Sequence, residues 1–112
     1  MFMHLFCRYV AFAALQAGTV PQVLITGGAG HSTQHLYDAV SKHPVWSCIP
    51  VGGDRTEADV LQDIFFSLGG TKQQLLPLET KSSNCGGNAE LSKQMIDREC
   101  PHITKVIVVQ VR

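Results

Sequence analysis

The sequence predicts an α/β fold, a Rossmann-like three-layer αβα arrangement with a mostly parallel sheet. Short apolar runs, typical of strands that are buried on both faces, alternate with segments whose apolar residues recur at helical spacing. A glycine cluster, Gly27–Gly30, separates the first apolar run from the helical segment that follows it. The chain of 112 residues has the length of one domain with one core, so we predict a single domain over 1–112.

The N-terminal segment, residues 1–17, is apolar nearly all round a helical wheel, which predicts a buried helix that Gly18 ends. A signal peptide fits less well, because Arg8 interrupts the apolar run and no basic segment precedes it. The run is too short to cross a bilayer, so we expect no membrane span. The sequence leaves open whether this segment is a native helix, a signal segment or an altered start.

The first predicted strand is Gln22–Thr26, and the glycine cluster follows it. The next helix begins at Ser32 or Thr33, carries an apolar face and ends at His43-Pro44; the face consists of Leu36, Tyr37 and Val40. Val45–Ile49 is a candidate for a short extended piece, in which we expect Trp46 to be a packing residue.

The clearest helical signal lies in the middle of the chain. Asp54 and Glu57 have the spacing of a capping box, and the apolar face that follows is Ala58, Leu61, Phe65 and Leu68. Gly69-Gly70 is the predicted end of this helix.

The last third of the chain contains two predicted strands, Gln74–Glu79 and Lys105–Val111, and a helix from about Asn88 to Glu99. Pro77 places the first of these strands at a sheet edge or ends it, whereas the second has the continuous apolar order of a central strand. The chain opens on a helix and ends on its best strand, so we expect an incomplete sheet that lacks its first strand and its C-terminal part. An uncovered sheet edge would favour self-association.

The charge and cysteine patterns exclude several classes of protein. Nine basic residues balance nine acidic ones and no Lys/Arg run occurs, so we expect no nucleic-acid partner. The four cysteines form no C-x-x-C pair, which indicates reduced thiols in a cytoplasmic protein. His31 and His35 are one helical turn apart, but no third ligand is evident, so we predict no metal site.

Three stretches carry a resemblance to a known family: Leu24–Thr33, Gly53–Ala58 and Glu79–Ala89. In this order and spacing they resemble the YdcF-like family of α/β domains, which includes the SanA and ElyC types, over about residues 21–110. The resemblance implies a Rossmann-like fold and a nucleotide-like or S-adenosylmethionine-like ligand, and it links some members to the cell envelope. The family's strand ahead of the first helix and its polar loop after the last strand are absent here, and Gly87 stands where the family usually has Glu.

The candidate ligand-binding residues are Gly27, Gly28, Gly30, His31, Ser32, Glu57, Ser82, Asn84 and Asn88. The three glycines are suited to cradle an anion at a helix N-terminus, although an ordinary strand-to-helix turn needs the same residues. The resemblance makes His31 a hydrogen-bonding ligand contact and gives Glu57 an acidic role. Ser32 is better explained as a helix N-cap than as a nucleophile, whereas Glu57 is equally explained as the partner of Asp54 in a capping box.

Ser82, Asn84 and Asn88 lie in the polar, glycine-containing loop predicted over 80–88, and by the resemblance they form the opposite wall of the ligand site. Side chains of these types also bond their own backbone in loops. We therefore predict a small-molecule-binding domain with a nucleotide-like or S-adenosylmethionine-like ligand. The alternatives are an inactive truncated fragment of such a domain, and a transferase or hydrolase acting on cell-envelope precursors. No nucleophile–base pair is visible, so the catalytic residues are unknown.

Overall fold

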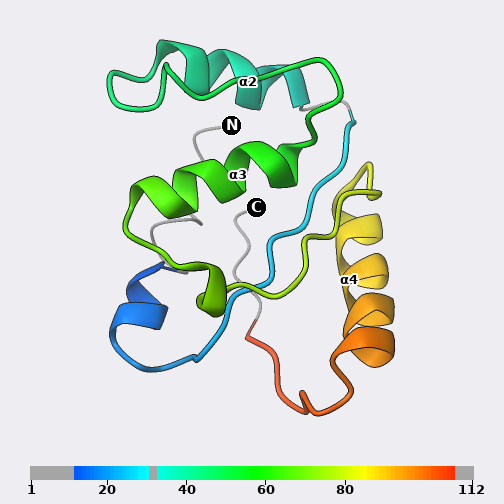
Figure 1. The fold of residues 1–112 in the computed structure, drawn as a ribbon. Coiled ribbons are helices and arrows are strands. Elements are labelled where there is room, and N and C mark those ends of the chain that lie inside the picture. Colours follow the sequence, from blue (N-terminus) through cyan, green and yellow to red (C-terminus); the bar gives the residue numbers. More distant parts are fainter. Residues whose placement is uncertain (1–11, 31–32, 108–112) are drawn as a thin grey trace.

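The computed structural model describes residues 12–30 and 33–107, so residues 1–11, 31–32 and 108–112 lie outside the description. Three α-helices are described in full: α2 (Thr33–Lys42), α3 (Glu57–Ser67) and α4 (Cys85–Glu99). Residues 12–16 are also helical, as predicted, but Leu15 is the one buried residue among them, so the predicted burial all round the helix is wrong for this part. A short 3-10 helix, η1, spans Lys72–Gln74. Figure 1 shows α2 lying over α3, with α4 on the other side of two extended segments.

The local signals for the three helices are confirmed, with changes at their ends. The buried residues of α2 are Thr33, Leu36, Tyr37 and Val40. The capping box of α3 is formed by Thr56 and Asp59, not by Asp54 and Glu57 as predicted. Asp59 Oδ2 accepts from the Thr56 N–H at 2.8 Å, while the Glu57 carboxylate turns toward α2.

The helices α3 and α4 end and begin at residues with recognisable roles. Gly69 follows the C-cap of α3 with a φ of +101°, a conformation that favours glycine. Asn84 is the N-cap of α4, so this helix begins three residues earlier than Asn88, where the sequence predicted its start. The Asn84 side chain supplies the capping acceptor that the prediction overlooked.

The prediction of a Rossmann-like αβα fold with a parallel sheet is wrong. The described residues form no β-strand, only two isolated parallel bridges, Val23 to Leu75 and Thr26 to Glu79. Val23 and Thr26 are three positions apart, whereas Leu75 and Glu79 are four apart. The second segment therefore carries one extra residue between the bridges, and it contains Pro77, which has no N–H to donate. A regular ladder cannot continue through this mismatch.

Two other predicted extended segments are also not strands. Residues 44–48 form a turn, in which the Ile49 N–H donates to Trp46 O at 3.0 Å. Residues 103–107 have no strand partner within the described chain, and Val106 and Ile107 are 61% and 64% exposed. The apolar order of 105–111 predicted burial on both faces, but burial requires neighbouring segments, and no described segment pairs with residues 103–107; residues 108–111 lie outside the description.

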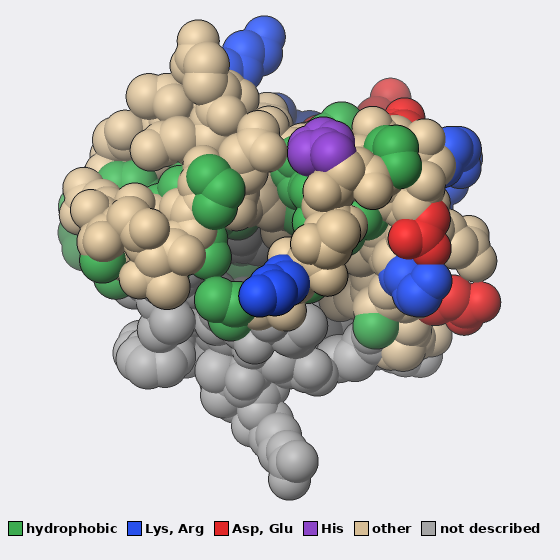
Figure 2. Space-filling model, turned by 90° about the horizontal axis from the view of Figure 1, so that it is seen from below, with side chains coloured by type: hydrophobic (Ala, Val, Ile, Leu, Met, Phe, Trp, Pro, Cys, Tyr) green, Lys and Arg blue, Asp and Glu red, His purple; other side chains and the backbone are tan. Residues whose placement is uncertain are grey.

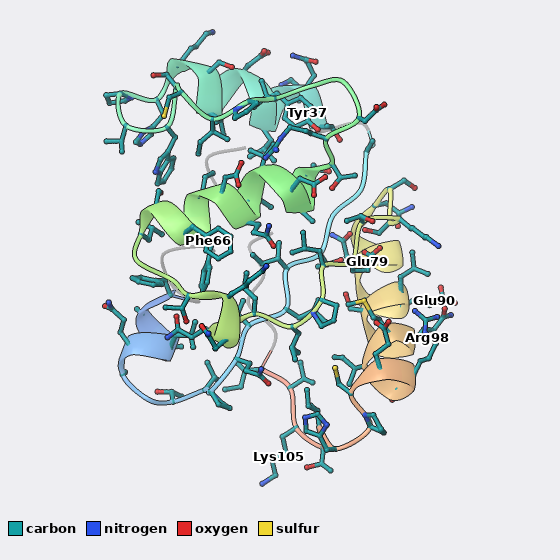
Figure 3. The ribbon with its side chains drawn as sticks, in the orientation of Figure 1. Tyr37, Phe66, Glu79, Glu90, Arg98 and Lys105 are labelled. Carbon is teal, nitrogen blue, oxygen red and sulfur yellow. The ribbon has the colours of Figure 1, made fainter. Side chains whose placement is uncertain are left out.

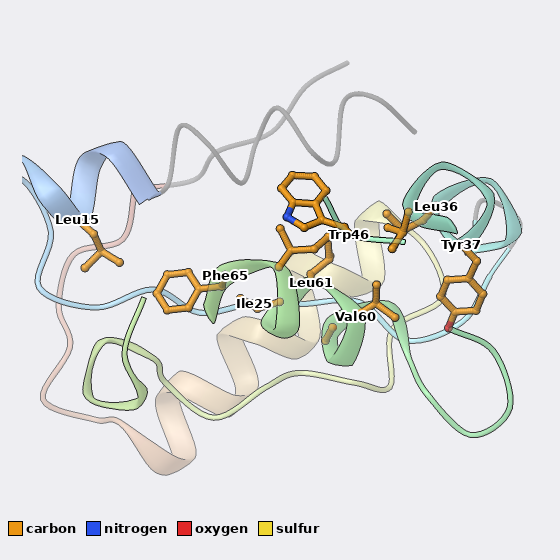
Figure 4. Close-up of a cluster of buried hydrophobic side chains, with 11 residues drawn as sticks. Leu15, Ile25, Leu36, Tyr37, Trp46, Val60, Leu61 and Phe65 are labelled. Carbon is orange, nitrogen blue, oxygen red and sulfur yellow. The ribbon is translucent and has the colours of Figure 1, made fainter. Parts of the chain in front are cut away.

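The hydrophobic core lies between α2, α3 and the first helical segment. Figure 4 shows Phe65 and Leu61 of α3 between Leu15 on one side and Leu36 of α2 on the other. The core contains Leu15, Ile25, Leu36, Tyr37, Val40, Trp46, Ala58, Val60, Leu61, Ile64 and Phe65. Trp46 is 2% exposed and stacks on the His43 ring at 4.0 Å, which confirms its predicted packing role. None of the α4 residues whose burial is described belongs to this cluster.

We expect Leu36→Ala to lower the free energy of unfolding by about 2–5 kcal/mol, because Leu36 is fully buried and the substitution leaves a cavity. Urea denaturation of the purified chain measures this loss. Val45→Ala is the control, since Val45 is 66% exposed and its truncation removes little buried surface. Equal effects of the two substitutions would contradict the described core.

Candidate functional site

The glycine loop, Gly27–Gly30, lies against the backbone of residues 80–83. The Gly27 N–H donates to Glu79 O at 2.9 Å and the Gly28 N–H donates to Ser82 O at 2.8 Å. The Gly30 N–H donates to the Thr33 hydroxyl oxygen at 2.7 Å. From the sequence we expected these three N–H groups to bind an anion. In the structure each of them donates a hydrogen bond within the chain.

The glycines at positions 28 and 30 are required by this backbone contact. A Cβ at Gly28 would lie 2.6 Å from Thr80 O, and a Cβ at Gly30 would overlap the carbonyl oxygen of Ser83. Real Cβ atoms do not tolerate such separations from a backbone oxygen. The loop is glycine-rich because another segment of the same chain passes next to it, which is one of the general uses of glycine.

The carbonyl groups of the glycine loop cap the start of α3. The Glu57 N–H donates to Gly28 O and the Ala58 N–H donates to Gly27 O, both at 2.9 Å. These N–H groups belong to the first turn of α3, which has no acceptors within the helix. The N-terminus of α3 is therefore satisfied by the loop, and the positive end of its dipole faces backbone carbonyls.

Glu57 and Tyr37 form a polar junction between α2 and α3. Glu57 Oε2 accepts from the Thr33 hydroxyl at 3.1 Å, and the Tyr37 hydroxyl donates to Arg55 O at 2.6 Å. Burial raises the pKa of the Tyr37 hydroxyl, and the negative charges of Glu57 and Asp59 raise it further. The side chain of Glu57 thus serves a tertiary contact in this structure, not the capping box proposed from the sequence.

Ser82, Asn84 and Asn88 lie together at the start of α4. Asn84 Oδ1 accepts from the Gly87 N–H at 2.7 Å, and the Ser82 hydroxyl donates to Asn88 Oδ1. Ser82 also accepts from Gly28 through its backbone oxygen, so the structure brings this group to the glycine loop. Each of these residues has a partner within the chain, and a ligand role for them stays a prediction. His31 and Ser32 lie outside the described residues.

Glu79 is a buried charged residue that the sequence analysis did not select. It is 5% exposed, and its carboxylate accepts from the Thr26 hydroxyl at 2.5 Å and from the N–H groups of Lys81 and Ser82 at 2.6 and 3.0 Å. Burial by itself raises the pKa of Glu79, but the hydrogen bonds from Ser82, Thr26 and Lys81 outweigh it, so the pKa lies below its ordinary value of 4.5. The sequence did contain a signal for Glu79, because this acidic residue stands at the end of the apolar run 75–78.

A cleft of about 340 Å³ lies between residues 77–81 and the second half of α4. Figure 3 shows Glu79 on the segment beside α4 and Arg98 on that helix. The cleft is lined by apolar and charged side chains, including Leu78, Lys81, Leu91, Met95, Arg98 and Glu99. Figure 2 shows acidic and basic side chains next to one another on the side where α4 lies, so that side does not present one sign of charge.

No protein-family model matches the chain, so the resemblance to the YdcF-like family stays a prediction. None of the helices in the described part of the chain combines the length and the apolar character that crossing a bilayer requires. Among the described cysteines, Cys48 and Cys100 are free thiols, the first exposed and the second buried.

We expect Gly28→Ala to destabilise the fold by at least about 1–3 kcal/mol, because its Cβ would press on two backbone carbonyls and break the hydrogen bond to Ser82. Thermal melting followed by circular dichroism measures the effect. Gly86→Ala is the matched control: it lies in the first turn of α4, its Cβ would have an ordinary 3.4 Å contact, and alanine favours helix. A Gly28→Ala variant as stable as Gly86→Ala would contradict the described backbone contact.

Because the pKa of Glu79 is lowered by folding, its ionised form stabilises the folded chain above pH 4.5, and this contribution is lost as the pH falls through the lower folded-state pKa. We expect Glu79→Gln to be less stable at pH 7 by about 1.5–3 kcal/mol, the usual cost of hydrogen bonds to a charged group. The variant should also lose less stability between pH 7 and acid. Urea denaturation at several pH values measures both effects, with exposed Glu90→Gln as the control. An unchanged acid profile in Glu79→Gln would show that Glu79 is not the buried charge.

Proposed function

We propose that this chain is a ligand-binding domain and that the cleft between residues 77–81 and α4 takes a small organic molecule. The observation that carries this proposal is the volume of about 340 Å³ together with its mixed lining. Ligand pockets usually fall in the range of about 300–1,000 Å³ and combine apolar walls with a few polar groups. Leu78, Leu91 and Met95 supply apolar surface, and Lys81 and Arg98 supply polar ends.

The cleft supports this proposal better than the glycine loop does. The loop's glycine N–H groups are used inside the chain, and its carbonyls cap α3. The cleft, by contrast, borders exposed side chains of α4 whose rearrangement disturbs no core contact; these include Gln94, Arg98 and Glu99. The ligand classes that the resemblance implies, nucleotide-like and S-adenosylmethionine-like molecules, are the first compounds to test.

A ligand that binds the folded chain alone should raise its melting temperature, with a stabilisation of about 2.7 kcal/mol at a concentration one hundred times its Kd. We expect adenosine monophosphate or S-adenosylmethionine to produce such a shift, measured by differential scanning fluorimetry. Leu91→Trp places a large ring in the cleft and should remove the shift. Ala89→Trp, on an exposed position of α4 outside the cleft lining, is the control and should keep it.

A shift that persists in Leu91→Trp would place the ligand elsewhere on the chain and contradict the proposed cleft. Both tryptophan variants should first be shown to unfold cooperatively in the absence of ligand. That measurement separates loss of binding from loss of the fold.

A further inference from the structure

The segment that lines the cleft uses only one of its two backbone edges. The Glu79 N–H donates to Ile25 O at 3.0 Å, and Glu79 O accepts from the Gly27 N–H at 2.9 Å. Both backbone groups of Glu79 therefore point toward the partner segment, residues 22–28. A trans peptide unit directs its carbonyl and its N–H to opposite sides, so the carbonyl of Leu78 and the N–H of Thr80, which share peptide planes with Glu79, point away from this partner segment.

The second edge has no hydrogen-bond partner within the described chain. The N–H and carbonyl groups of Leu78 and the N–H of Thr80 make no hydrogen bond there, in contrast to Leu76 and Glu79, whose N–H groups bond to the partner segment. Leu78 and Thr80 both line the cleft, and α4 forms its opposite wall. An unpaired backbone edge thus faces a helix across a groove.

We propose, on the basis of the cleft assigned above, that the cleft also accepts a short peptide, bound in an extended conformation along residues 77–81. An extended peptide adds to an exposed edge through main-chain hydrogen bonds, and adjoining pockets select its side chains. The free groups of Leu78 and Thr80 have the alternation that such a peptide needs. Leu91 and Met95 supply an apolar wall for one side chain of the peptide.

The length and charge of the peptide follow from the two ends of the edge. Pro77 has no N–H, so pairing ends there, and the turn held by the Glu79 carboxylate ends it at Lys81. Residues 77–81 span about 13 Å in an extended conformation, which corresponds to four or five peptide residues. The charged lining residues are two bases, Lys81 and Arg98, and two acids, Glu79 and Glu99, so recognition needs no net charge on the peptide.

A panel of capped pentapeptides, acetyl-Ser-Thr-X-Thr-Ser-amide with Ala, Val, Leu or Phe at X, tests the proposal. Binding is followed by the amide ¹H–¹⁵N chemical shifts of the labelled full chain. We expect a Val, Leu or Phe peptide to shift the Leu78 and Thr80 amide signals most strongly. N-methylation of the peptide amides, which leaves the side chains unchanged, should weaken binding about tenfold or more, because it removes main-chain donors.

Two variants complete the test. Thr80→Pro removes one unpaired N–H and should weaken peptide binding while the chain still melts cooperatively; if this variant does not fold, Leu91→Trp against Ala89→Trp gives the same comparison. Peptides that bind equally well after N-methylation would overturn the proposal. If no peptide binds while adenosine monophosphate or S-adenosylmethionine occupies the cleft, the peptide proposal is wrong and the ligand-binding proposal stands. If neither class binds, both proposals are wrong.

Discussion

The close approach of the glycine loop to the backbone of residues 80–83 is the contact on which the arrangement of the described chain depends. It joins segments whose bridge residues, Thr26 and Glu79, are 53 positions apart. On one side of the loop, the carbonyls of Gly27 and Gly28 complete the first turn of α3. On the other side, the hydrogen bond to Ser82 O holds the segment that leads into α4. A side chain at Gly28 would separate these elements.

The carboxylate of Glu79 reinforces the same approach from inside. A buried charge is costly unless donors surround it, and here the donors come from both segments. Thr26 belongs to the first segment, while Lys81 and Ser82 belong to the turn that follows Glu79. The negative charge therefore stabilises both the pairing of the two segments and the turn before α4.

The two sides of this pairing differ in how their backbone hydrogen-bonding groups are used. Toward α2 and α3, backbone donors and acceptors of the glycine loop are used in caps and bridges, and the core fills the space between the helices. Toward α4, the extended segment retains free backbone groups beside a cleft. A ligand at the glycine loop would have to displace contacts that hold the fold, whereas a ligand in the cleft would displace water. This difference in cost is why our functional proposals centre on the cleft.

The sequence by itself determined the helices, because their signals and their hydrogen bonds lie within one segment. The apolar faces of α2 and α3 and Gly69 after α3 are properties of neighbouring residues. The Asn84 cap of α4, which our prediction missed, is also a local property. The N-cap of α3 is Thr56, whereas the prediction was Asp54, so the start of this helix differs from the prediction by only two positions.

Tertiary structure alone decided the rest. A strand needs a partner in register, and neither the extra residue around Pro77 nor the exposure of Val106 can be seen in an apolar run. The roles of Gly28 and Glu79 depend on residues about fifty positions away, because close approach and burial are properties of two segments that meet, and no local pattern records which segments those are.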